Sequence, residues 1–169
     1  MEAITQNLRT DYLSMTLCQV RRMMQSDDDI GIGVDLVEMK RFRSISDDSS
    51  FFARVYTERE LEYCRAFSNP VPHLAATFAG KEAVLKAIGI REGTPIKEIE
   101  ILRDREGAPY VEYNLPTHRI IVSLSHTENY AAAVALAIPA GRSLGDEYIR
   151  KLLNGMASEL AATHGDEDE

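Results

Sequence analysis

The ten-residue run FAGKEAVLKA, residues 78–87, constrains the fold more than any other part of the chain, because three charged side chains interrupt an otherwise apolar segment. At 100° per residue, Glu82 and Lys86 lie one turn apart on one face of a helix. Lys81 is flanked by Val84 and Leu85, so no broad polar face remains through which the helix could contact water. The run therefore predicts a long central helix that is buried over most of its surface.

The charges in this helix have two interpretations. A Glu-to-Lys pair at positions i and i+4 is common on solvated helices and contributes only a few tenths of a kcal/mol. A charge inside a core, in contrast, is costly unless it is paired or bound to a metal or a ligand. The surrounding alanines, valine and leucine favour a buried helix over a solvated one. We therefore expect a functional role for these charges, with a structural ion pair as the alternative.

Composition sets the broad class of the protein. With 169 residues, of which 44% are hydrophobic, the chain can bury one core and is expected to form one domain. A net charge of −8 disfavours non-specific binding to nucleic acid. No apolar run reaches membrane-spanning length and no signal peptide is recognisable, so we expect a cytoplasmic protein without a membrane partner. Cys18 and Cys64 have no metal-ligand spacing and are expected to be free thiols.

One predicted strand, Ile30 to Val37, carries an unusual acidic residue. Alternation places Asp35 on the same face as Gly31 and Gly33. Asp is depleted in strands, and glycine neighbours leave room for a ligand or for another backbone to approach closely. Asp35 is therefore a candidate site residue.

The remaining periodicities predict an α+β chain. Thr57 to Glu60 form a capping box at the start of a helix. The segments 98–102 and 110–113 form one hairpin, and 120–124 and 130–138 form another, although the alanines of the last run also permit a helix. We divide the chain into an N-terminal helix with an acidic linker (1–29), a central domain (30–139), and a C-terminal helix with a disordered acidic tail (140–169).

Side chains from separate segments suit a magnesium-dependent phosphate site. Asp35 and Glu82 supply two carboxylates, and Mg²⁺ usually takes one or two from the protein while phosphates and waters complete its coordination. His126 taken alone is better explained as a turn histidine with local hydrogen bonds. As a set, the phosphate-binding candidates are Lys81, Lys86, Ser125, His126 and Thr127.

A local basic cluster stands out against the acidic background of the chain. Lys40, Arg41 and Arg43 lie just after the predicted strand. Taken by themselves, these residues are better explained as a solvated helix face than as a binding surface.

Five ordered motifs, GIGVDLVEMKRF, FFARVYTERELEYC, FAGKEAVLKA, EIEILRDREGAPYV and VSLSHTENYAAAVA, resemble the holo-acyl-carrier-protein synthases. These are the small, single-repeat 4'-phosphopantetheinyl transferases, and the resemblance covers residues 30–138. It implies a mostly antiparallel sheet packed around a long central helix, with the terminal helices as additions. It also implies a homotrimer with its sites at subunit interfaces.

The resemblance implies magnesium-dependent transfer of 4'-phosphopantetheine from coenzyme A to a serine of an apo acyl carrier protein, in fatty-acid or polyketide biosynthesis. Adenosine 3',5'-bisphosphate is the other product. The alternative is a non-catalytic module on the same fold that binds or assembles carrier proteins.

The resemblance also assigns roles to residues. Asp35 and Glu82 match the magnesium ligands, and Glu82 is our candidate for accepting the serine proton, directly or through water. The other matches are Lys86 and Lys81 as phosphate-contacting lysines, Ser125, His126 and Thr127 as the segment that holds coenzyme A, and Arg41, with Arg43 beside it, as the docking site of the acidic carrier protein. This replaces the solvated-face interpretation of the basic cluster.

Overall fold

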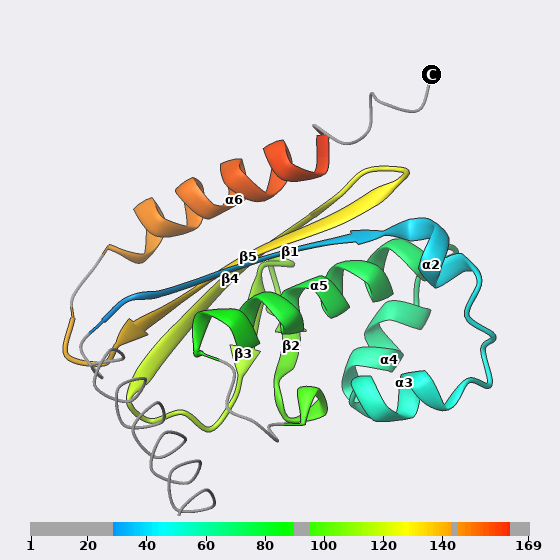
Figure 1. The fold of residues 1–169 in the computed structure, drawn as a ribbon, viewed down its shortest axis with the longest axis horizontal. Coiled ribbons are helices and arrows are strands. Elements are labelled where there is room, and N and C mark those ends of the chain that lie inside the picture. Colours follow the sequence, from blue (N-terminus) through cyan, green and yellow to red (C-terminus); the bar gives the residue numbers. More distant parts are fainter. Residues whose placement is uncertain (1–28, 90–94, 143–144, 163–169) are drawn as a thin grey trace, which may run out of the picture.

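A three-stranded antiparallel sheet lies between two long helices (Figure 1). The computed structural model describes residues 29–89, 95–142 and 145–162. The strand order is β1 (Gly31–Glu38), β5 (Tyr130–Pro139) and β4 (His118–His126), so β5 is central. Helix α5 (Val71–Ala87) packs on one face, and α6 (Asp146–Ala162) packs on the other.

The smaller elements lie around α5. Strands β2 (Glu100–Arg103) and β3 (Pro109–Glu112) form an antiparallel hairpin, preceded by the 3-10 turn Ile96–Glu98. Three short helices, α2 (Met39–Arg43), α3 (Ser50–Val55) and α4 (Glu58–Arg65), gather at one end of the molecule in Figure 1. The predicted α+β class, with an antiparallel sheet and a long central helix, is confirmed.

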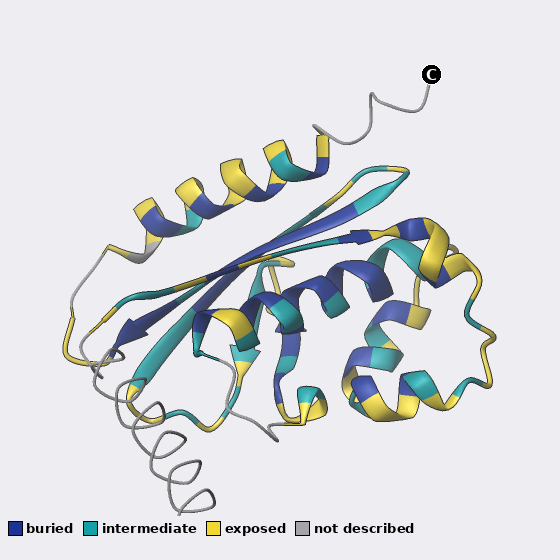
Figure 2. Ribbon diagram, in the orientation of Figure 1, coloured by how far each residue is buried: buried dark blue, intermediate teal, exposed yellow. Residues whose placement is uncertain are grey.

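Helix α5 is buried along nearly its whole length, as Figure 2 shows. Pro72 occupies the first turn, where the missing N–H costs no helical hydrogen bond. Gly89 follows the helix with φ 67°, the left-handed conformation in which helices commonly end. The predicted central helix is therefore present, and Lys86 is its exposed charge near the C-terminal end.

Strand β1 contacts α5 through its backbone. A Cβ at Gly31 would lie 1.8 Å from the carbonyl oxygen of Ala87, and one at Gly33 would lie 1.9 Å from that of Ala83. The sequence left two explanations for these glycines, room for a ligand or room for another backbone. In the structure the backbone of α5 occupies the space beside them. Asp35, next on the same face, is thereby held against the same helix.

The segment 130–138, for which the sequence allowed either a strand or a helix, lies in strand β5. Alternate alanines of β5, at 131, 133, 135 and 137, are buried in the core shared with α5. Their small side chains let a helix pack closely, and the larger Val134 and Ile138 face the opposite side. Alanine enrichment therefore reflects packing here and not helix propensity.

Helix α6 covers the second face of the sheet. Ile149, Leu153 and Ala157 are buried against Ile121, Val134 and Ile138, and Asn154 accepts a 2.6 Å hydrogen bond from Ser123. The predicted C-terminal amphipathic helix is thus present. The predicted N-terminal helix, with Cys18, and the acidic tail lie outside the described residues. Within the described ranges, no helix combines the length and apolar character needed to cross a membrane.

We expect Gly33→Ala to lower the free energy of unfolding by at least about 3 kcal/mol, because its methyl group would overlap the Ala83 carbonyl and neither backbone can yield easily. Gly155→Ala is the matched control, since nothing lies within 4 Å of its Cβ position in α6. That change should stabilise by about 0.5–1 kcal/mol. Urea denaturation measures both, and equal stability of the two variants would contradict the backbone contact.

Candidate active site

The first cluster of charges joins β1 to α5. The Lys86 ammonium donates a 2.8 Å hydrogen bond to Asp35 Oδ1 and another, also 2.8 Å, to the Val34 carbonyl oxygen. The Asp35 side chain is 16% exposed and that of Lys86 is 42% exposed. Lys86 therefore pairs across to the strand and not with Glu82 on its own helix.

Glu82 is the third charged residue of this cluster, because it interacts electrostatically with both Asp35 and Lys86. Burial raises the pKa of its carboxyl group, the Asp35 carboxylate raises that pKa further, and Lys86 opposes both effects. Two carboxylates and one ammonium group therefore lie close enough to influence one another in a partly buried region. Repulsion of this kind favours a bound cation, a proton, or a ligand that brings a cation.

The donor set fits Mg²⁺ held jointly with a phosphate ligand. Asp35 and Glu82 supply hard oxygen donors from two different elements. Among the described residues, no group of three or more His, Cys, Asp or Glu side chains could hold a metal ion by itself. Mg²⁺ commonly binds one or two carboxylates and completes its octahedron with phosphate and water, so two carboxylates are sufficient.

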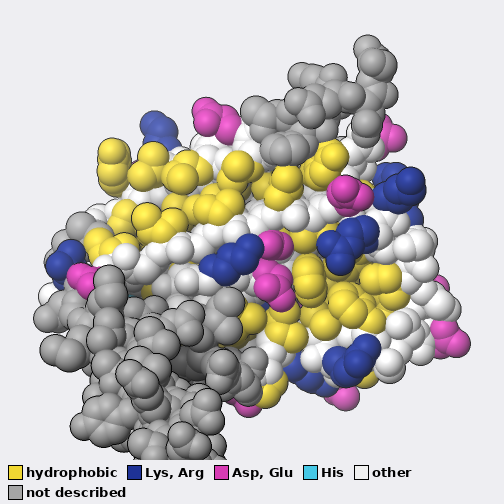
Figure 3. Space-filling view, viewed as in Figure 1, with side chains coloured by type: hydrophobic (Ala, Val, Ile, Leu, Met, Phe, Trp, Pro, Cys, Tyr) yellow, Lys and Arg dark blue, Asp and Glu magenta, His cyan; other side chains and the backbone are white. Residues whose placement is uncertain are grey.

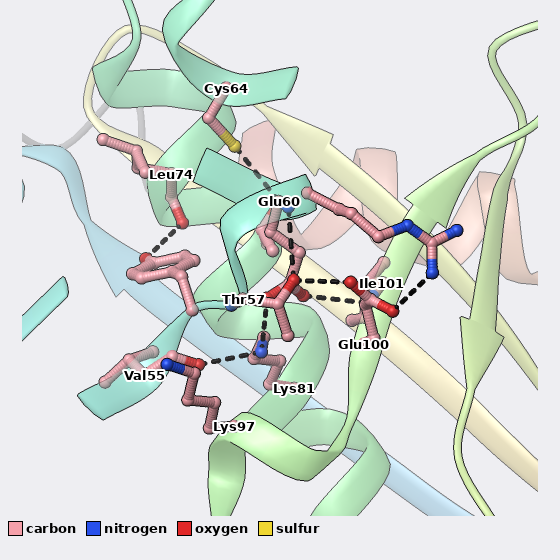
Figure 4. A network of polar contacts seen from close by, with 12 residues as sticks. Val55, Thr57, Glu60, Cys64, Leu74, Lys81, Lys97, Glu100 and Ile101 are labelled. Atoms are coloured by element: carbon pink, nitrogen blue, oxygen red, sulfur yellow. Dashed lines mark hydrogen bonds and ion pairs between the residues drawn. The ribbon is translucent and has the colours of Figure 1, made fainter. Parts of the chain in front are cut away.

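Lys81 lies outside this cluster, which corrects the prediction that it contacts coenzyme A. Its side chain is 0% exposed, and the ammonium lies 2.6 Å from Glu60 Oε2 and donates a 2.8 Å hydrogen bond to the Val55 carbonyl (Figure 4). Burial lowers the pKa of Lys81, and Glu60 opposes this effect. A fully enclosed ammonium has no surface for a phosphate, so Lys81 is a structural residue.

Glu60 has a wider role than the helix cap that the sequence predicted for it. Its Oε2 accepts from the Thr57 backbone N–H in the predicted capping box, and its Oε1 accepts from the Ile101 backbone N–H. One carboxylate thereby joins α4, α5 and β2. The spacing of Thr57 and Glu60 predicted the capping box, but no local pattern in the sequence predicted the ion pair with Lys81 on α5.

The segment Ser125 to Thr127 lies away from the carboxylates within one chain. Asp35 is opposite Ala133 on β5, and Ala133 is opposite Leu124 on β4, so β4 is the far edge strand. Two strand spacings amount to roughly 10 Å, and the segment lies one to three residues further along. Thr127 Oγ1 also donates a 3.4 Å hydrogen bond to the Ala161 carbonyl of α6. Within one chain the two predicted halves of the site are therefore separated by roughly 10 Å or more.

The basic cluster lies within the short helix α2, which directly follows β1. Lys40, Arg41 and Arg43 are exposed, while Phe42 between them is buried. Arg43 donates a 2.9 Å hydrogen bond to the Glu128 carbonyl in the β4–β5 turn, which fixes the helix to the hairpin. The Arg41 guanidinium is available at the surface six residues beyond Asp35.

His73 was missed by sequence reasoning. Its ring lies 5.9 Å, centroid to centroid, from that of His126 on β4. It also stacks on Phe67, with a centroid distance of 3.6 Å and an interplanar angle of 18°. No spacing rule connects residues so far apart in the sequence, and the contact exists only because α5 begins beside the end of β4.

The fold and these charges define a class of protein. Residues 31–135 match the family model described as the 4'-phosphopantetheinyl transferase superfamily. The chain belongs to that superfamily, and its relatives are holo-[acyl-carrier-protein] synthases, so it is an enzyme of the phosphopantetheinyl transferase class. The matched range contains Asp35, Glu82, Lys86 and His126, and it excludes α6.

Three relatives illustrate the similarity. The chain is 41% identical over 105 residues to the holo-[acyl-carrier-protein] synthase of Thermodesulfovibrio yellowstonii, covering 61% of this chain and 93% of the relative. It is 44% identical over 115 residues to that of Aquifex aeolicus, covering 62% and 94%. The crystal structure of the Bacillus anthracis synthase in complex with CoA (3',5'-ADP) superposes with a TM-score of 0.59 at 29% identity, covering 65% and 96%.

We expect Lys81→Met to lower the free energy of unfolding by about 3–5 kcal/mol, because it leaves the buried Glu60 carboxylate without its counter-charge. Lys86→Met is the control, since its ion pair is partly exposed and should contribute at most about 1 kcal/mol. Chemical denaturation compares the two. The double variant Glu60→Gln, Lys81→Met should recover part of the loss, and a stable Lys81→Met variant would refute the structural role.

Proposed function

We propose that this chain transfers the 4'-phosphopantetheine group from coenzyme A to a serine of an apo acyl carrier protein and releases adenosine 3',5'-bisphosphate. The observation that carries the proposal is the cluster of Asp35, Glu82 and Lys86 at the contact of β1 and α5, inside the range that matches the family. The relatives named holo-[acyl-carrier-protein] synthases support the reaction, and the synthase structure with CoA supports the donor.

Asp35 and Glu82 are the residues that would hold Mg²⁺. The metal would neutralise negative charge that builds on the departing bisphosphate and on the pyrophosphate oxygens. Lys86 acts on the same oxygens. Its ammonium has three N–H donors, and two of them reach Asp35 and Val34, so one remains for a phosphate oxygen.

Glu82 is the proposed proton acceptor. The serine hydroxyl oxygen forms a bond to the β-phosphorus while the bond from that phosphorus to the bridging oxygen breaks, and adenosine 3',5'-bisphosphate leaves with that electron pair. The serine proton passes to Glu82, directly or through a water molecule. A carboxylate that also holds Mg²⁺ is a poor base by itself, so transfer of the proton through a water molecule is the preferred route.

We further propose that the enzyme assembles as a homotrimer in which Ser125, His126 and Thr127 of one copy face the carboxylates of the next. The far-edge position of this segment within one chain supports a shared site. Exposed apolar side chains also support assembly, and Figure 3 shows them in a row along α6 and beside it on the same face. Among the described residues, the large exposed apolar side chains include Ile32 and Val34 on β1 and Tyr148, Leu152 and Met156 on α6.

The carrier protein is the proposed partner of α2. Acyl carrier proteins present acidic surfaces according to the resemblance, and the exposed Arg41 and Arg43 offer complementary charge close to Asp35. The setting we propose is cytoplasmic fatty-acid or polyketide biosynthesis.

Incubation of the protein with Mg²⁺, coenzyme A and an apo carrier protein should add one phosphopantetheine group to the carrier, which mass spectrometry detects. We expect Glu82→Gln to reduce the rate at least about 100-fold, because both proton transfer and metal binding are impaired. Glu106→Gln, in the exposed β2–β3 turn, is the matched control and should retain the wild-type rate.

Removal of Mg²⁺ with a chelator should stop the reaction, and its return should restore it. Full activity of Glu82→Gln would refute the assignment of that residue. Tight carrier binding without any mass change would instead identify a non-catalytic module on the same fold.

Arg41→Glu should raise KM for the carrier protein about tenfold or more while leaving the affinity for coenzyme A unchanged, because it reverses a surface charge at the proposed docking helix. Arg105→Glu, an exposed arginine in the β2–β3 turn, makes the same charge change elsewhere. Steady-state kinetics with each substrate varied separates the effects. Equal loss for both substrates, or an equal effect of Arg105→Glu, would contradict docking at α2.

A further inference from the structure

Helix α6 packs mainly on two strands of the sheet, β4 and β5, and leaves apolar side chains of β1 open. Ile32 is 62% exposed, and Val34 is also exposed. Both side chains point to the α6 side of the sheet, because their cross-strand partners on β5, Leu136 and Val134, belong to the core under α6. The apolar core under α6 therefore continues outward onto β1.

A row of exposed apolar side chains on α6 adds to this surface (Figure 3). The row consists of Tyr148, Leu152 and Met156, which recur every four residues, and Tyr148 is 74% exposed. A surface helix usually confines its apolar residues to the stripe that it buries, and this row lies beside that stripe. Helix α6 therefore carries more apolar surface than the sheet covers.

The polar contacts of α6 show which way the row faces. On the other side of the buried stripe, Arg150 donates a 3.3 Å hydrogen bond to the Pro109 carbonyl oxygen of β3, and Asn154 accepts one from Ser123 of β4. Successive residues turn by 100° around a helix, so the row lies on the side turned away from β4, toward β1. The row and the two exposed residues of β1 form one apolar area, which we call the β1–α6 surface.

The segment that leads into β1 has a matching pattern in its sequence. Leu13, Leu17, Val20 and Met24 recur at helical spacing, which predicts a helix with one apolar face. This is the N-terminal helix predicted from the sequence, and it lies outside the described residues. Isolated helices of this length are marginal in water, so such a helix needs an apolar surface on which to pack.

The length and the attachment of the segment suit the β1–α6 surface. Residues 13–24 span about 17 Å as a helix, and residues 148–156 of α6 span about 12 Å. Only residues 25–30 separate the segment from β1, and they include the turn-favouring run 26–29. Short tethers of this kind give effective concentrations in the millimolar range, which favours the chain's own segment over a second copy.

Charge favours one direction for the segment. The last turn of α6 reaches the β4–β5 turn through Thr127, so the first turn of α6 lies at the opposite end of the sheet, where β1 begins. A helix that turns back before β1 runs antiparallel to it and brings Arg21 and Arg22 to this end. Exposed Glu147 lies there, in the first turn of α6, and offers the opposite charge.

We propose that residues 13–24 form a helix that covers the β1–α6 surface of the same chain, with its apolar face on Ile32, Val34 and the α6 row. The sheet then lies between α5 on one face and two antiparallel helices on the other. Asp35 faces α5, so the covering helix leaves the carboxylate cluster open. With this surface covered, copies of the chain meet elsewhere, for example at the β4 edge that a shared site requires.

Disulfide trapping in the full chain tests the contact. In a Cys18→Ser background, Val20→Cys and Val34→Cys place two thiols at positions that the antiparallel arrangement brings together, and Cys64 is buried. Mild oxidation should join them at least about tenfold faster than the control pair Gln19→Cys and Val34→Cys, because Gln19 lies on another face of the helix. Non-reducing electrophoresis and peptide mass spectrometry detect the bond.

The size of the oxidised product identifies the occupant. A disulfide within one chain, at the mobility of a single copy, supports the proposal. A disulfide that joins two copies would overturn it in favour of the segment of a second copy, and equal rates for the two pairs would overturn the contact itself. A wild-type protein that modifies no carrier, together with a disulfide within one chain, would overturn the proposed transferase function and leave this contact standing.

Thermal unfolding provides a second measurement that needs no cysteine. Leu17→Asp should lower Tm by about 3 °C or more, and Leu152→Asp should do the same, because each puts a charge into the same apolar contact. Their combination should lower Tm by clearly less than the sum, since residues in contact are not independent. Gln19→Asp is the matched control and should leave Tm within about 1 °C of wild type. Fully additive losses, or an equal effect of Gln19→Asp, would contradict the proposal.

Discussion

The contact between the backbones of β1 and α5 is the constraint on which the site depends. Gly31 and Gly33 remove the side chains that would separate strand from helix, and the helix presents alanine carbonyls at the same points. Asp35 follows on the same face and meets Lys86, with Glu82 one turn earlier on the helix. Any larger residue at the glycines would move the two halves of the carboxylate cluster apart, so packing and chemistry are set by the same few atoms.

A second polar contact holds this helix from the other side. Glu60 accepts hydrogen bonds from two backbone amides and pairs with Lys81, so one carboxylate caps α4, fixes β2 and neutralises a buried ammonium. Neighbouring residues of α5 therefore have different surroundings: Lys81 is enclosed in the core beside Glu60, whereas Glu82 is half-buried and lies close enough to Asp35 for that carboxylate to raise its pKa. Helical geometry turns consecutive residues 100° apart and makes this division possible.

The sheet also separates two groups of candidate site residues. Asp35 lies on the edge strand β1, and His126 lies at the end of the other edge strand, β4, with β5 between them. Helix α6 lies outside the range matched to the family, and it covers the sheet face opposite α5 while reaching the β4–β5 turn through Thr127.

The sequence alone determined the α+β class, the capping box, the glycine strand and the charges of the central helix, because periodicity and backbone propensity are local properties. It also identified Asp35, Glu82 and Lys86 as candidates through residue chemistry and family resemblance. Only the tertiary structure decided that Lys81 is a core residue, that Lys86 pairs with Asp35, and that His73 meets His126. Those outcomes depend on which elements lie side by side, and residues 21 to 53 positions apart become neighbours only once the strands and helices have packed.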